Sequence, residues 1–309
     1  AGAEHVSVGV PVEIEARGRR GKLEALPAVS SQHVGQRRGR HEIAQPHARV
    51  EAVARLRVDR ASGNLQAGAE VAEAPAAEGA AGPLGLSVST LNNPFFVTLR
   101  DGAESAAADA GVELVVVDAQ DDPAQEATNI EDLIQQDVAA LLVNPTDAAA
   151  IVPSIQRANE AGIPVFTIDR AAEGGEVVSH IASDNVAGGR MAAEYLCEAL
   201  GGEGNVVELE GIAGTSAARD RGQGFNDYMS SECTGVTIVA RQTANFNRAE
   251  GLTVFENILT AEPEIDGVFA HNDEMILGAI EAAEAAGRAE EITFVGFDAI
   301  DDALQAVRD

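Results

Sequence analysis

The segment LGLSVSTLNNPFFVTLRDGAESAAADAGVELVVVD, residues 84–118, contains the pattern that decides the fold. An apolar run at 84–89 is followed by a helical stretch that ends in glycine at 101–111, and then by a second apolar run at 113–118. Glycine directly after a helical stretch is a typical C-terminal cap. Apolar strands that alternate with helices indicate a parallel sheet whose two faces are covered by helices.

This alternation continues to the end of the chain. Nine strands are too many for one small doubly wound sheet, so the pattern favours two such sheets in series, with a change of domain near residues 184–189. The predicted class is therefore α/β, with two doubly wound parallel-sheet lobes. The strands are expected at 84–89, 113–118, 140–144, 164–169, 178–182, 205–210, 237–241, 267–272 and 292–297.

Composition excludes several functions. Among 309 residues, 50 acidic side chains outnumber 21 basic ones, giving a formal net charge of −29. Such a chain repels phosphate backbones, which argues against general nucleic-acid binding. No apolar run approaches the ~18 residues that a membrane span requires. Two cysteines cannot build a disulfide scaffold or a four-ligand zinc site, and we expect no metal or other cofactor.

Residues 1–82 differ from the remainder. They carry 11 Lys+Arg and 10 Asp+Glu and no aromatic residue, whereas the later part holds 10 and 40. Without large apolar side chains the segment cannot bury enough surface to fold, so we expect a disordered extension. A basic arm for nucleic acid or lipid and a segment outside the natural coding frame remain alternatives. The segment contains no apolar core of the signal-peptide type.

Polar or aromatic residues follow several of the predicted strands. Ligands of open parallel sheets bind beyond the carboxyl ends of the strands, so these residues predict a ligand site. They lie at 92–96, 144–147, 169–170, 272–274 and 298.

The same residues carry a family resemblance, which spans residues 84–309. The chain resembles the periplasmic sugar-binding proteins of ABC importers. The matching stretches are STLNNPFF (89–96), NPTD (144–147), DR (169–170), GEVVSHIASDN (175–185), GIAGTSAARDRG (211–222), FAHNDEM (269–275) and VGFD (295–298).

The resemblance implies two lobes, 83–186 and 187–309, joined by a hinge and closing on one monosaccharide. It implies D-ribose in particular, delivered to the membrane subunits of an ABC permease. It further implies a monomer in the periplasm or outside the cell, with a lipid anchor and a chemotaxis receptor as open possibilities.

It also implies nine ligand contacts. Polar side chains would exchange hydrogen bonds with sugar hydroxyls, and aromatic faces would pack on the ring. Arg221 is preferred to Arg219 because it matches the second arginine of the family's segment. The nine residues are Asn93, Phe95, Phe96, Asp169, Arg170, Arg221, Phe246, Asn272 and Asp298.

Structural roles remain open for these positions. Asn93 precedes Pro94 and is equally suited to cap a helix, as are Asn272 and Asp298 after their strands. The two phenylalanines after Pro94 suit an ordinary core. The acidic and basic pair at 169–170 would also suit a surface ion pair of little energetic value.

The family extends several dozen residues past the strand at 292–297, with a further glutamine contact and a segment that returns to the first lobe. This chain ends at Asp309. We therefore expect a first lobe that is incomplete and exposes apolar surface.

Two further questions concern the reaction class and the cysteines. No P-loop, nucleophile elbow or HExxH motif occurs, so we expect no enzyme. The alternative function is the effector-binding core of a sugar-responsive repressor, which would require a helix-turn-helix that 1–82 do not display.

Cys197 and Cys233 form either a disulfide or two buried thiols, depending on the compartment.

Overall fold

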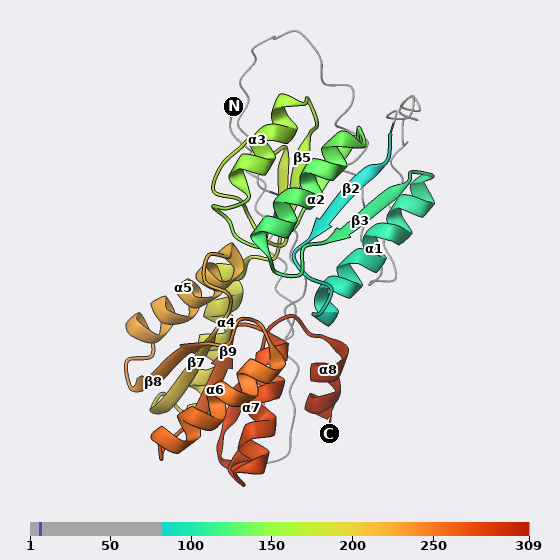
Figure 1. The fold of residues 1–309 in the computed structure, drawn as a ribbon. Coiled ribbons are helices and arrows are strands. Elements are labelled where there is room, and N and C mark those ends of the chain that lie inside the picture. Colours follow the sequence, from blue (N-terminus) through green and yellow to red (C-terminus); the bar gives the residue numbers. More distant parts are fainter. Residues whose placement is uncertain (1–5, 8–81, 309) are drawn as a thin grey trace, which may run out of the picture.

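The structure, a computed structural model, describes residues 6–7 and 82–308 (Figure 1). The disorder expected for 1–82 falls almost entirely on residues outside the described ones and stays a prediction. Val6–Ser7 form a two-residue strand, β1, that was not expected.

The first lobe is built on a parallel six-stranded sheet with the order β1-β6-β5-β4-β2-β3. Helices cover both faces of this sheet, in the cyan-to-green part of Figure 1. Its other elements are β2 (Leu84–Val88), α1 (Pro94–Ala110), β3 (Leu114–Asp118), α2 (Pro123–Gln135), β4 (Ala140–Val143), α3 (Val152–Glu160), β5 (Val165–Ile168) and β6 (Ser179–Ala182).

The second lobe is built on a parallel four-stranded sheet with the order β10-β9-β7-β8. It forms the yellow-to-red part of Figure 1. Its elements are α4 (Asn185–Leu200), β7 (Gly204–Glu210), α5 (Ser216–Ser231), β8 (Val236–Thr243), α6 (Arg248–Ala261), β9 (Gly267–Ala270), α7 (Asp273–Ala285), the 3₁₀ turn η1 (Ala289–Glu291), β10 (Thr293–Val295) and α8 (Asp301–Arg308).

All nine predicted strands are present, each within three residues of its expected ends. The two-lobed parallel α/β class is therefore confirmed. Each sheet separates two apolar clusters, one on each face, which is why its strands are apolar along their whole length. The division at residue 186 stays a prediction; β6 ends at Ala182 and α4 begins at Asn185.

Apolar side chains around β6, the strand next to β1, and at the start of α4 remain partly open to solvent. Val178 and Ile181, beside and on β6, are 38% exposed. Val186, at the start of α4, is 39% exposed. The incompleteness expected for this lobe stays a prediction.

The two lobes touch beside the segment that joins them. The Ala148 amide of the first lobe donates to the Gly214 carbonyl of the second over 3.0 Å. The Ala171 amide donates to the Ser216 hydroxyl over 2.8 Å. These hydrogen bonds hold the carboxyl ends of the two sheets against each other.

Helices α4 and α5 approach closely at a glycine. A Cβ at Gly189 would lie 2.0 Å from the carbonyl oxygen of Arg221, so this position accepts no side chain without a backbone shift. The contact fixes the backbone of Arg221 against α4.

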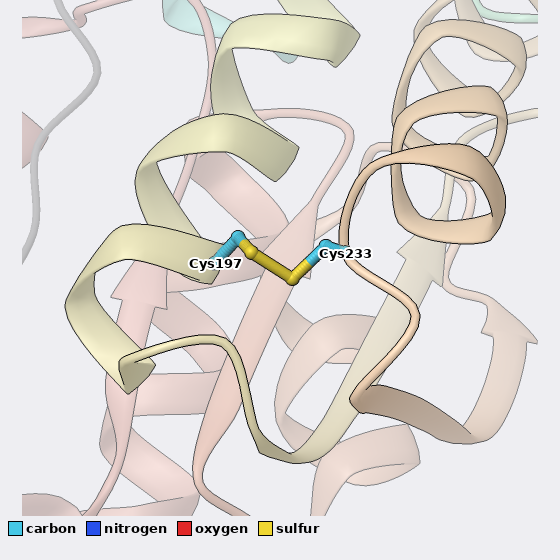
Figure 2. Close-up of a disulfide and its surroundings, with 2 residues drawn as sticks. All are labelled: Cys197 and Cys233. Atoms are coloured by element: carbon cyan, nitrogen blue, oxygen red, sulfur yellow. A yellow bond between two sulfur atoms is a disulfide. The ribbon is translucent and has the colours of Figure 1, made fainter.

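A disulfide joins α4 to the segment that follows α5 (Figure 2). Cys197, near the end of α4, is bonded to Cys233, which follows α5, with Cα atoms 6.1 Å apart. The alternative of two free thiols is therefore wrong. The bond closes a loop between residues 36 positions apart.

None of the helices in the described part of the chain is both long and apolar enough to cross a membrane. Within the same residues, no group of three His, Cys, Asp or Glu side chains could hold a metal ion.

We expect loss of the disulfide to lower the free energy of unfolding by about 3–4 kcal/mol, because the open chain gains loop entropy when unfolded. The measurement is urea unfolding of the full chain against its Cys197→Ser/Cys233→Ser variant. Dithiothreitol should lower the urea midpoint of the native chain and leave the urea midpoint of the variant unchanged. Equal midpoints for both proteins would contradict this contribution.

Candidate ligand-binding site

All nine predicted ligand residues line one cavity between the lobes. Asn93, Phe95, Phe96, Asp169 and Arg170 come from the first lobe. The second lobe supplies the other four, and Ala217 completes the lining. The structure thus brings together side chains from six loops or helix ends, although they are spread over more than 200 residues.

The start of α1 forms one wall of the cavity. Asn93 caps the helix by accepting a hydrogen bond from the Phe95 amide over 2.9 Å, and Pro94 occupies the first helical turn. The rings of Phe95 and Phe96 meet edge to face, with centroids 5.2 Å apart. Asn93 therefore caps α1, as the structural alternative had it, and it also lines the cavity.

Asp169 and Arg170 follow β5 and are both buried, so the alternative of a surface ion pair is wrong. Arg170 is 2% exposed and Asp169 8%. The Arg170 Nε lies 3.9 Å from the Asp169 carboxylate, and Nη1 donates to the Pro145 carbonyl over 3.3 Å. Nε itself has no hydrogen-bond partner in the described structure. Burial lowers the pKa of the Arg170 guanidinium, against the opposing effect of Asp169.

Residues 144–146, which directly follow β4, form hydrogen bonds that support Asp169 and Arg170. The Asn144 side chain accepts from the Ser89 amide over 3.1 Å and donates to the Asp169 carboxylate over 3.4 Å. Thr146 is held by Glu126 of α2, whose carboxylate accepts from the Thr146 hydroxyl over 2.6 Å and from its amide. Burial raises the pKa of Glu126 to about 7, although the hydrogen bonds from Thr146 oppose the rise.

Arg221 of α5 is the corresponding cation of the second lobe. Its Nη1 donates to the His271 carbonyl over 2.5 Å and lies 3.1 Å from the Asp298 carboxylate. Nε donates to the Asn185 side chain, and the guanidinium lies 3.7 Å from the Phe297 ring centroid. Arg221 is 3% exposed.

The Asp298 side chain, 7% exposed, lies against Arg221. Burial raises the pKa of Asp298 to about 7, while Arg221 opposes the rise. Asp298 does not cap a helix as one alternative had it, since α8 begins three residues later and the carboxylate is engaged by Arg221.

A second buried carboxylate supports Arg221 indirectly. Glu208 of β7 is completely buried and accepts from the His271 ring Nε2 over 2.9 Å and from Arg241 Nε over 2.7 Å. The other ring nitrogen of His271 accepts from the Gly211 amide, so the proton lies on Nε2. His271 is thereby fixed, and its carbonyl is the acceptor of Arg221.

Phe246 lies between the two guanidinium groups. Their carbon atoms are 5.5 Å (Arg170) and 5.9 Å (Arg221) from its ring centroid. A Cβ at Gly211 would meet this ring at 2.1 Å, so a glycine is needed beside it. Asn272 caps α7 by accepting from the Met275 amide and donates to the Phe246 carbonyl over 3.4 Å. Capping and cavity lining again coexist.

Three cavity residues adopt a left-handed backbone that non-glycine residues rarely take. The φ angles are +62° at Asp169, +57° at Phe246 and +108° at Asp298. Backbone strain of this kind persists where surrounding structure imposes it, and it concentrates at functional sites. It aims these three side chains into the cavity lining.

A second hollow of about 380 Å³ adjoins the first and shares Asn93, Phe96, Arg170 and Phe246 with it. Apart from Ile212, its further lining is polar and comes from both lobes, with Asp121 from the first and Arg248 and Glu274 from the second. The polar lining therefore continues beyond the nine predicted residues.

Sequence reasoning missed the residues that support the site, namely Glu126, Asn185 and Glu208. Glu126 carried a signal, since it precedes the buried Ile130 and Leu133 by four and seven positions and so lies on the apolar face of α2. Glu208 interrupts the apolar run of β7 in the same way. Asn185 carried no comparable signal.

Two parallel α/β lobes that meet at one buried polar cavity define a two-lobed solute-binding protein. The sequence model of the periplasmic binding protein domain matches residues 84–309, and the chain belongs to this family.

Curated relatives and solved structures agree with this family. The ribose import binding proteins of Bacillus subtilis (strain 168) and Escherichia coli (strain K12) are each 50% identical to this chain over 226 residues. The match covers 73% of this chain and 72% and 75% of theirs. The Caulobacter myo-inositol binding protein bound to myo-inositol has a TM-score of 0.71 at 34% identity, covering 73% of this chain and 78% of that one. A solute binding protein from Actinobacillus succinogenes with bound D-allose has a TM-score of 0.69 at 36% identity, covering 72% and 81%.

Arg221 and Arg219 offer a matched pair for testing the buried network. We expect Arg221→Gln to lower the free energy of unfolding by about 3–5 kcal/mol, because it leaves buried polar partners without their cation. Arg219→Gln should change it by less than about 1 kcal/mol, since that side chain is 52% exposed. Urea unfolding of both variants measures the difference. Equal effects would mean that Arg221 is not held in a buried network.

Proposed function

We propose that this chain captures D-ribose outside the cytoplasm between its two lobes and delivers it to the permease of an ABC importer. The observation that carries the proposal is the chemistry of the cavity. Two guanidinium groups and two carboxylates, one of each from each lobe, line the same small space, and a buried Arg170 Nε there lacks a hydrogen-bond partner. A polyhydroxylated ligand supplies what such groups need.

The relatives support ribose over other sugars. The two proteins that share 50% identity with this chain are ribose import binding proteins. The structures with bound D-allose and myo-inositol share 36% and 34%. All three ligands are neutral and carry several hydroxyls, so charged side chains that read hydroxyl positions suit the whole group.

The nine residues take distinct roles in this proposal. Asp169 and Asp298 accept from sugar hydroxyls, and Arg170 and Arg221 donate in a planar fork. Asn93 and Asn272 do both through their amides, and the three phenylalanines pack on the C–H faces of the ring. Hydrogen bonds to charged groups contribute about 1.5–3 kcal/mol each, and a sugar that lacks one hydroxyl leaves a buried group unpaired.

Closure of the lobes follows from the same arrangement. Neither lobe alone surrounds the cavity, so a sugar bound to both sides favours the closed state over the open one. The hydrogen bonds from Ala148 to Gly214 and from Ala171 to Ser216 add lobe-to-lobe contacts beside the ligand.

The proposed place of action is the periplasm. The family description and the Cys197–Cys233 disulfide, which persists in oxidising compartments, both support it. We further propose a monomer that binds without chemical conversion and without nucleic acid. A lipid anchor and contact with a chemotaxis receptor extend this proposal.

The alternative of a repressor core receives less support. It requires a helix-turn-helix ahead of the lobes, and the residues concerned fall almost entirely outside those that the structure describes. The relatives at 50% identity are import proteins, which favours transport.

A thermal melt of the full chain, followed by circular dichroism, tests the ligand. D-ribose at ~100 times its dissociation constant should add about 2.7 kcal/mol to the free energy of unfolding, because it binds the folded state alone. D-glucose at the same concentration is the control. A melt that shifts equally with both sugars, or with neither, would contradict ribose as the ligand.

We expect ribose affinity to fall as pH drops from 8 to 6. The proposed acceptor is the ionised Asp298, whose pKa burial raises to about 7, so below that pH binding must first displace a proton. With that pKa the dissociation constant should rise by about tenfold in all between pH 8 and pH 6. Isothermal titration calorimetry measures it, and Asp298→Asn should remove most of the slope while weakening binding at pH 8. An unchanged slope in that variant would be evidence against this acceptor.

A further inference from the structure

The cavity described above is supported by one ionisable side chain that does not line it. Glu126 lies on α2, is 1% exposed, and shares its helix face with Ile130 and Leu133. A carboxylate in such surroundings destabilises the fold unless it is hydrogen-bonded or protonated. Its presence among apolar neighbours therefore calls for a role outside packing.

Every hydrogen bond that the described structure gives to the Glu126 carboxylate comes from one residue, Thr146. The hydroxyl donates over 2.6 Å, and the amide lies 3.2 Å and 3.1 Å from the two carboxylate oxygens. These hydrogen bonds hold the backbone of Thr146 in place, and not only its side chain. The peptide unit held in this way begins with the carbonyl of Pro145.

That carbonyl is the acceptor of Arg170. Nη1 donates to it over 3.3 Å, while Nε remains without a hydrogen-bond partner. The orientation of the guanidinium therefore depends strongly on where the Pro145 carbonyl points. A shift of the 145–146 peptide would turn the fork of Arg170 within the cavity.

We propose that Glu126 is a positioning residue of the ligand site, which holds Thr146 and Pro145 so that Arg170 presents its fork to the ligand. The inference rests on the proposed function for the identity of the ligand. The ordering of the Arg170 side chain by Glu126 rests on the contacts alone. The second lobe uses the same device, since buried Glu208 fixes His271, whose carbonyl accepts from Arg221.

The charge environment agrees with this arrangement. Asp147, beside Thr146, disfavours the ionised form of Glu126, while Arg170 favours it, and burial raises the pKa of Glu126 to about 7. The lobe therefore accommodates the neutral form as well. An amide at position 126 could accept from the Thr146 amide and donate to its hydroxyl, so Glu126→Gln is the conservative variant.

The experiment is ribose titration by calorimetry at pH 8 with the full chain. Glu126→Ala should weaken binding about tenfold, since Thr146 loses its acceptor and the 145–146 peptide is free to turn. Glu126→Gln should restore most of the affinity. Ile130→Ala, one turn along the same buried face, controls for general loss of stability and should leave affinity unchanged.

A double-mutant cycle with Arg170→Lys tests whether the effect passes through Arg170. The loss caused by Glu126→Ala should largely vanish in the Arg170→Lys background. An equal loss in both backgrounds, or no loss in the native one, overturns the proposal. Should Glu126→Ala fail to fold, Thr146→Val replaces it in the same cycle, with an expected loss of about threefold.

A ligand-free measurement separates this proposal from the proposed function. The Nε–H resonance of Arg170 in ¹⁵N-edited NMR should be sharp in the native chain and shift or broaden in Glu126→Ala. If the native chain binds no ribose, the proposed function fails while this resonance still decides whether Glu126 orders Arg170. An unchanged resonance overturns the positioning role whatever the ligand.

Discussion

The structure depends on keeping two guanidinium groups buried between the lobes. An isolated buried charge is strongly destabilising, so each arginine needs a carboxylate and a carbonyl acceptor nearby. Arg170 has Asp169 and Pro145, and Arg221 has Asp298 and His271. Each set belongs to one lobe, so neither arginine takes these partners from the other lobe. The cavity is electrostatically balanced when all four groups are ionised, which suits a neutral ligand rich in hydroxyls.

The carbonyl acceptors are themselves held by buried carboxylates. Glu126 accepts hydrogen bonds from Thr146, the residue after Pro145, and Glu208 is hydrogen-bonded to the ring of His271. Both carboxylates lie on apolar faces of regular elements, where packing alone would favour a hydrophobic side chain. In each lobe a buried carboxylate thus holds the residue whose carbonyl, or whose neighbour's carbonyl, accepts from the arginine.

Backbone strain completes the site. Asp169 and Asp298 follow β5 and β10, and both leave the sheet in left-handed conformations, as Phe246 does after β8. Extended strands alternate their side chains between the two faces, so a residue that must point along the strand direction into the cleft needs an unusual φ. The surrounding hydrogen bonds and the close contact between Gly211 and Phe246 maintain these conformations.

The sequence by itself determined the nine strands and the two-lobed class, and the family resemblance of its motifs singled out the nine residues that line the cavity. Apolar runs and glycine caps report local burial and chain reversal, and polar residues at strand ends report the face where ligands bind. Tertiary structure decided the rest. The pairing of Arg221 with Asp298, the bond between Cys197 and Cys233, and the grip of Glu126 on Thr146 join residues 77, 36 and 20 positions apart. Such contacts depend on how helices and sheets stack, and no local pattern records that stacking.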